Sequence, residues 1–164
     1  MKGTEIREKK RSEIRAGFRA AILARGGECD EPNESGAMRF RIACGERRLA
    51  GNFYFSKYHS QSTAYNLWFQ FPFFVEKSKI SDYALTLGYL NACTTRGVYE
   101  MKPENGLCGY RMTNRIGSGK IAKEACDRTV SDALNMADKA LADLERVAQG
   151  QWDPDTFVRN YKAY

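Results

Sequence analysis

The chain has 164 residues, of which 43% are apolar and 28% charged, so it has the length and composition of one globular domain rather than of a disordered segment. No run approaches the roughly 20 apolar residues of a membrane helix, and the charged N-terminus lacks the apolar core of a signal peptide. We therefore expect a cytoplasmic protein that does not span a membrane. The net charge of +6 lies mainly in residues 1–25, which hold eight basic and three acidic side chains.

The first predicted element is a helix over residues 5–25. Ile14, Phe18 and Ile22 recur every four residues and form one apolar stripe between charged side chains, as on a helix that packs one face against a core. A pair of glycines follows the stripe. Glycine readily takes the left-handed conformation that ends helices, so we expect the helix to stop there.

Three stretches of alternating apolar and polar residues come next, over residues 37–44, 47–55 and 64–75. An alternation with a period of two predicts half-buried strands, and their order predicts an antiparallel meander. Pro72, in the third stretch, cannot donate a hydrogen bond to a neighbouring strand. We expect it at a sheet edge, at a bulge or at the end of the strand.

A second helix is predicted over residues 78–93, with Ser81 as its N-terminal cap. Its expected buried face consists of Ile80, Ala84, Leu87 and Leu90. A hairpin follows, with strands over residues 97–101 and 107–116. The sequence Pro-Glu-Asn-Gly between them favours a tight turn, because proline and glycine fit the backbone angles that turns require.

The last long helix is predicted over residues 120–149, where an apolar stripe continues to Val147 and Gly150 stops it. Asp153 and Pro154 then begin a short helical turn. The fold class is therefore α+β, in the order α-β-β-β-α-β-β-α, with an antiparallel sheet packed against helices. We expect one domain over residues 1–150 and a short helical tail over residues 151–164.

Candidate catalytic and metal-binding residues are few. His59 is the only histidine and lies in a polar loop without the glycine turn of a nucleophile, so a surface histidine is the simpler interpretation. The stretch Gly117–Lys120 lacks the upstream glycine of a phosphate-binding loop. The five cysteines include no C-x-x-C pair and are expected to be reduced. We expect no enzyme activity, no cofactor and no metal.

Aromatic residues are concentrated in residues 53–74, and three of them lie on the face opposite the expected core. These are Tyr54, Trp68 and Phe74. Either a second layer of the protein covers them, or they form a homodimer face or a face that binds a ligand or partner, since exposed apolar patches mark interfaces.

The basic first helix is a second candidate surface. Its cationic residues are Lys9, Lys10, Arg11, Arg15 and Arg19. Such residues can contact phosphates of nucleic acid or an acidic protein surface. They can also simply form the solvated face of a helix, and both interpretations remain open.

A family resemblance lies in two stretches. They are LGYLNACTTRGVYEMKPENGLCGYRMTNRI, over residues 87–116, and ALNMADKALADLERVAQG, over residues 133–150. Together with the order of elements, they resemble the YbjN-like group, which is associated with bacterial sensory transduction and shares its fold with type III secretion chaperones. The resemblance implies a dimeric, non-enzymatic adaptor that holds a protein segment against its sheet. It implies no catalytic residue.

The leading hypothesis is a protein-binding module, chaperone-like or regulatory and expected to be a homodimer, that contacts a protein partner through the sheet face and its flanking helices. The alternative is a nucleic-acid-binding protein that uses the basic first helix. An enzyme with an unrecognised site and an inhibitor of a host defence system are further alternatives.

Overall fold

The computed structural model describes residues 2–56, 64–115 and 123–161, and it has the α+β architecture that the sequence predicts. The elements are α1 (Lys2–Leu23), β1 (Glu28–Cys29), β2 (Met38–Cys44), β3 (Arg47–Phe55), β4 (Ala64–Phe74), the 3-10 turn η1 (Lys77–Lys79), α2 (Ile80–Ala92), β5 (Val98–Lys102), β6 (Leu107–Arg115), α3 (Lys123–Ala148) and α4 (Pro154–Asn160). No helix in these ranges is both long enough and apolar enough to cross a membrane.

The strands form one sheet in the order β1-β2-β3-β4-β6-β5, and all neighbours are antiparallel. This confirms the predicted meander and hairpin, and it places β6 beside β4 in the middle of the sheet. Strand β1 is an addition that the sequence did not predict. It has only two residues, which pair with Arg41 and Phe40 of β2, and so short a strand carries no alternation to detect.

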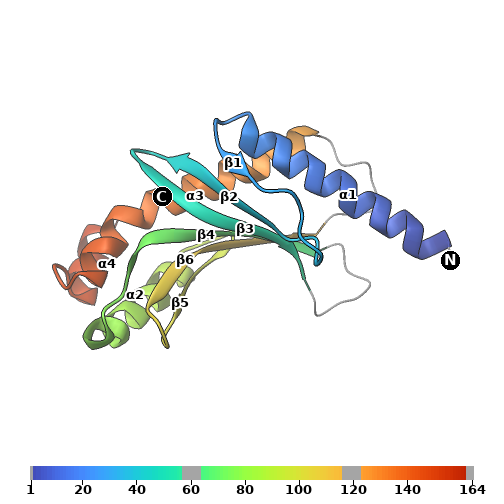
Figure 1. Ribbon diagram of the computed structural model, residues 1–164. Helices are drawn as coiled ribbons and strands as arrows, with labels where there is room; N and C mark the ends of the chain where they lie inside the picture. The colour runs from blue at the N-terminus through green and yellow to red at the C-terminus, as the bar shows by residue number, and fades with distance from the viewer. Residues whose placement is uncertain (1, 57–63, 116–122, 162–164) are drawn as a thin grey trace.

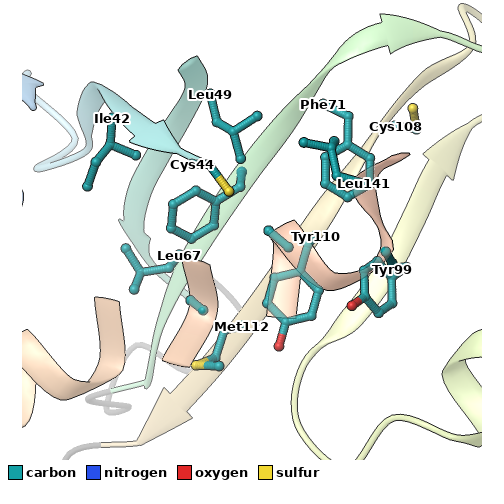
Figure 2. Packing of buried hydrophobic residues seen from close by; sticks show 14 of the residues in the cluster. Ile42, Cys44, Leu49, Leu67, Phe71, Tyr99, Cys108, Tyr110, Met112 and Leu141 are labelled. Atoms are coloured by element: carbon teal, nitrogen blue, oxygen red, sulfur yellow. The ribbon is translucent and has the colours of Figure 1, made fainter. Parts of the chain in front are cut away.

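The helices gather on one face of the sheet (Figure 1). Side chains on that face are buried in every second position of β2, whose burial alternates from Met38 to Cys44. Phe18 of α1 packs against the rings of Phe53 and Tyr65, with centroids 5.0 and 4.8 Å apart. Figure 2 shows how residues of β2 to β6 meet α3 across the core. The burial of these apolar side chains between the sheet and the helices stabilises the fold.

A polar clamp joins the end of α1 to α3. The guanidinium of Arg25 donates hydrogen bonds to the carboxylate and the main-chain oxygen of Asp127, to Ser131 and to the main-chain oxygen of Ala21. The hydrogen bond from Arg25 holds the pKa of Asp127 below its usual range. Two helices 100 residues apart in sequence are therefore fixed by one side chain.

The ends of α1 and α2 differ from the predictions. Helix α1 ends at Leu23, and Gly26 then takes a φ of 69°, the left-handed conformation expected of a helix end. Helix α2 begins after η1 with Lys79 at its cap position, where no side chain caps it, so the prediction that Ser81 caps the helix was wrong. Ala84, predicted to be buried, is exposed, because Tyr83 and Thr86 fill the core beside Leu87 and Leu90.

Other local predictions agree with the structure. Pro72 lies in an inner strand, but the register of β4 and β6 shifts between Gln70 and Phe74, so the predicted bulge is present. Asp153 caps α4 by accepting a hydrogen bond from Thr156 N at 2.7 Å. Helix α3 ends at Ala148, close to the predicted stop, while the start predicted at residue 120 lies outside the described residues.

Candidate functional site

The side of the sheet away from the helices has no described element packed over it, and we call it the open face. Its side chains alternate along each strand with those of the core, so most of them are exposed or half-buried, although Asn66 is buried. The open face consists of Arg39 and Arg41 of β2, Arg48, Ala50, Asn52 and Tyr54 of β3, Asn66, Trp68, Gln70, Pro72 and Phe74 of β4, Arg111 and Thr113 of β6, and Val98, Glu100 and Lys102 of β5, with Glu28 and Asp30 at the β1 end.

Trp68 lies in the middle of the open face. Its direct neighbours across the strands are Asn52 on β3 and Arg111 on β6. Tyr54 pairs with Asn66, one diagonal step from Trp68, and both aromatic side chains are half-buried. The structure therefore brings two of the three predicted aromatic site residues together at the centre of the sheet.

Phe74 lies apart from this pair. It comes six residues after Trp68 on β4, about 20 Å along an extended strand, and beyond the bulge at Pro72. Its side chain is 61% exposed. The third predicted residue thus forms a separate apolar point at the end of β4 and is not part of the central cluster.

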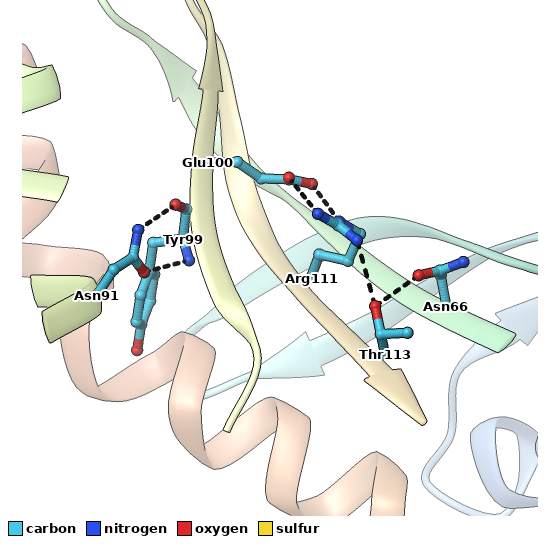
Figure 3. A network of polar contacts seen from close by, with 6 residues as sticks. All are labelled: Asn66, Asn91, Tyr99, Glu100, Arg111 and Thr113. Carbon is cyan, nitrogen blue, oxygen red and sulfur yellow. Dashed lines mark hydrogen bonds and ion pairs between the residues drawn. The ribbon is translucent and has the colours of Figure 1, made fainter. Parts of the chain in front are cut away.

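A hydrogen-bonded network joins side chains of β4, β5 and β6 on the open face (Figure 3), and its Arg111 is the cross-strand neighbour of Trp68. Arg111 donates from Nε and Nη2 to both carboxylate oxygens of Glu100, at 2.9 and 3.0 Å. It also donates to Thr113 at 3.2 Å, and Thr113 donates to the amide oxygen of Asn66 at 2.7 Å. A bidentate arginine–carboxylate pair has a defined geometry, so this half of the open face is preorganised.

Tyr54 lies close enough to this network to feel its charges. Burial raises the pKa of the Tyr54 hydroxyl, and the positive charge of Arg111 opposes that rise. The hydroxyl therefore stays protonated at neutral pH. It can donate one hydrogen bond to a bound group from the centre of the open face.

The other half of the open face is hollow above Ala50. The hollow has a volume of about 430 Å³, and Arg39, Arg41, Asn52 and Gln70 are among the residues that line it. Both arginines are exposed and form no ion pair or side-chain hydrogen bond with the described residues. Sequence reasoning treated them only as the polar side of a strand. The sequence did contain a signal for this basic site, namely two arginines two positions apart on the polar face of a predicted strand.

The basic residues of α1 are partly engaged inside the protein. Arg15 pairs with Glu8 at 2.6 Å and Arg19 with Glu31 at 2.7 Å. The guanidinium groups of Arg11 and Arg15 lie over the ring of Phe55, at 5.0 and 5.7 Å from its centre. Lys9 is exposed and Lys10 half-buried. Three of the five predicted nucleic-acid contacts thus already hold the helix in place.

A second hollow, of about 690 Å³, lies between β6 and α3. Arg96 and Asp132 line it and form an ion pair at 2.8 Å, and Glu124 and Arg128 line it as well. Its charged side chains balance, so it offers no net charge to select a ligand.

Residues suited to catalysis or metal binding do not gather in the described part of the chain. Three thiols are buried, and burial raises the pKa of Cys126 and of Cys108 to about 11 and, with Asp138 nearby, that of Cys44 to about 12. Protonated thiols are poor nucleophiles and poor metal ligands. No group of three histidine, cysteine or acidic residues in those ranges could hold a metal ion. His59 and Gly117–Lys120 lie outside the described residues.

Fold and surface together define an α+β domain in which a layer of helices covers one side of an antiparallel sheet and the other side is open. Comparisons with protein-family models, with curated proteins and with solved structures find no match to this chain.

Proposed function

We propose that this chain is a non-enzymatic protein-binding module that contacts its partner through the open face. The observation that carries the proposal is the position of the half-buried pair Tyr54 and Trp68, at the centre of a sheet face over which no described element packs. When a partner removes large aromatic side chains in such a place from water, their burial stabilises the complex.

The residue types of the open face favour a protein partner. Tryptophan, tyrosine and arginine are the residues that contribute most to binding energy at protein interfaces, and the face has all three around Trp68. The network from Glu100 to Asn66 already fixes Arg111, so less side-chain freedom is lost on binding. The polar surroundings also suit a partner that binds reversibly.

We also propose that the chain is a YbjN-like domain and a homodimer. The order α-β-β-β-α-β-β-α, to which the structure adds only the two-residue strand β1, the 3-10 turn η1 and the short helix α4, supports the first part, because it is the order of that group. For the dimer, the outward side of α2 is the better surface. Its exposed residues include Ala84, Leu85, Gly88 and Ala92, none of which is charged. Two open faces would instead bring arginines such as Arg39 and Arg41 of each copy together, which repel.

Nucleic-acid binding through α1 is the alternative proposal, and it has less support. The ion pairs of Arg15 and Arg19 would have to break before both could contact phosphates, which reduces what those contacts gain. A gel shift that weakens with added salt and disappears in a Lys9→Gln, Lys10→Gln variant would favour this alternative over the protein-binding proposal.

Site-specific photo-crosslinking tests the proposed function. A photoreactive amino acid replaces Asn52 on the open face or, as the matched control, Ala142, which is exposed on α3. In cells that make the protein, we expect the Asn52 variant to form a discrete adduct with another protein that survives nuclease treatment, and the Ala142 variant not to form it. No adduct from Asn52, or the same adduct from both positions, would refute the proposal.

A further inference from the structure

We propose that the hollow above Ala50 binds an extended, acidic segment of the partner protein, with Arg39 and Arg41 on its carboxylates. This inference rests on the proposed function, because it assigns the chemistry of the partner that the open face binds. It follows from the shape of the hollow, from its net positive charge and from the spacing of its two arginines.

The shape results from one small residue among long ones. In the register of the sheet, Ala50 lies between Arg41 on β2 and Gln70 on β4. Arg39 and Asn52 are opposite each other one step further along. A methyl group surrounded by four larger polar side chains leaves a depression, and its volume of about 430 Å³ is enough for one or two side chains of a partner.

The hollow has a net positive charge, because its two arginines lie against one acid, Asp30, that is not already in an ion pair within the described residues. Eight other arginines form ion pairs within the described residues. Arg39 and Arg41 form none, although both are adjacent on one strand face. Of the acids near the hollow, Glu28 already pairs with Arg48 at 3.1 Å, which leaves Asp30 at the rim. A carboxylate from a partner would relieve the repulsion between the two guanidinium groups and could accept paired hydrogen bonds.

The spacing of the two arginines matches an extended peptide. Alternate residues on a strand are about 6.5 Å apart, and so are alternate side chains of any other extended chain. A segment with acidic residues at every second position that lies along β2 would place one carboxylate on Arg39 and the next on Arg41. The amides of Asn52 and Gln70 would then face its main chain, where each can donate and accept a hydrogen bond.

The distribution of acids on the open face favours a peptide over a single-stranded nucleic acid. Glu28 and Asp30 border the hollow, and Glu100 lies at the other side of the face. A nucleic acid has a negative charge on every nucleotide and would meet these carboxylates along with the arginines. A peptide, by contrast, can have acidic residues only at the positions that lie against the arginines and uncharged residues elsewhere.

Fluorescence anisotropy with three labelled probes tests the inference. The probes are a short peptide of alternating glutamate and threonine, the same peptide with glutamine for glutamate, and oligothymidylate. We expect the glutamate peptide to bind about tenfold or more tightly than the other two, as loss of charge-assisted hydrogen bonds predicts. Equal binding of both peptides, no binding of the glutamate peptide, or tighter binding of oligothymidylate would overturn the inference.

Three variants locate the site. Arg39→Gln with Arg41→Gln removes the charges and keeps side-chain length, and Ala50→Leu fills the hollow and keeps the charges. Arg128→Gln with Arg159→Gln removes the same charge from exposed positions on α3 and α4. We expect the first two variants to lose binding of the glutamate peptide about tenfold and the third to keep it. Equal losses in all three would show unspecific attraction to a basic protein and overturn the inference.

The adduct formed from Asn52 separates this inference from the proposed function. If the Arg39→Gln, Arg41→Gln variant loses the adduct, both stand. If the adduct persists undiminished, the open face binds a protein but not through an acidic segment, and only the inference fails. Equal unfolding midpoints of the variants and the original chain establish that the exposed substitutions do not act through misfolding.

Discussion

Single residues set how closely the strands and side chains of this sheet can pack, and Gly51 is the clearest case. It lies in β3, opposite Phe40 on β2 and Phe69 on β4. The ring of Phe40 covers its backbone and meets Phe69 edge-on, with centroids 5.4 Å apart. A Cβ on residue 51 would contact the Phe40 ring and lie 2.6 Å from the main-chain oxygen of Trp68. Glycine is therefore required here by the room available.

We predict that Gly51→Ala lowers the free energy of unfolding by about 1–3 kcal/mol, as overpacking of a close-packed core usually does. Urea unfolding followed by circular dichroism measures it. In a Phe40→Leu background the same substitution should cost less, because the ring no longer covers residue 51, although the contact with the Trp68 oxygen remains. A Gly51→Ala protein as stable as the original would show that the β2–β3 pair relaxes freely.

At the scale of elements, the free edge of β5 depends on a helix. Asn91, in the last turn of α2, donates to the main-chain oxygen of Tyr99 and accepts from its N–H, both at 2.8 Å (Figure 3). The amide of Asn91 thus satisfies the main-chain donor and acceptor of Tyr99 that a further strand would otherwise pair with. Edge strands with free donors and acceptors can pair with other chains, so this contact also protects the sheet.

Replacing Asn91 by alanine tests this role of α2. We predict a loss of about 1–3 kcal/mol of unfolding free energy, since two hydrogen bonds of about 0.5–1.5 kcal/mol each are removed. Amide hydrogen exchange should accelerate most at Tyr99. Asn52→Ala is the matched control, because the Asn52 side chain forms no hydrogen bond with the described residues, and it should leave stability and exchange unchanged. Equal effects of the two substitutions would contradict the prediction.

Local patterns were sufficient to predict most of these elements. Alternation in residues 37–44 predicted β2, and glycines predicted the ends of α1 and α3. The pattern failed for α2, because Ala84, Leu85 and Leu87 make it apolar on several sides and no stripe fixes which side is buried. It also gave no sign of Asn91, whose partner lies eight residues along the chain and meets it only in the folded structure.

At the scale of the whole molecule, the helices lie on one face of the sheet, and no described element covers the opposite face. Alternation predicted that Tyr54 and Trp68 point away from the core, but only the placement of the helices on the other face shows that no described element packs over them. The hollow above Ala50 could not be predicted, because it depends on the register that places Ala50 between Arg41 and Gln70. Sequence alone does not define that register across three strands.

The outward side of α2 is the surface through which we propose that the homodimer forms. Leu85 is 67% exposed on the outward side of α2, and Ala84, Gly88 and Ala92 beside it are exposed and small. A Cβ added at Gly88 would meet no heavy atom within 4 Å, so a second helix can approach closely there. None of these four residues has a charge that would oppose the meeting of two chains with a net charge of +6 each.

We predict that the protein is a dimer by size-exclusion chromatography with light scattering, and that Leu85→Glu converts it to a folded monomer, because two buried carboxylates would face each other across the axis. Phe74→Glu is the matched control. It places the same charge on an apolar residue that is 61% exposed at the end of the open face, and it should remain dimeric. If Phe74→Glu gave the monomer and Leu85→Glu did not, the open face would be the dimer interface and unavailable to an acidic partner. A monomeric original chain would refute the homodimer and leave the open face as the binding surface.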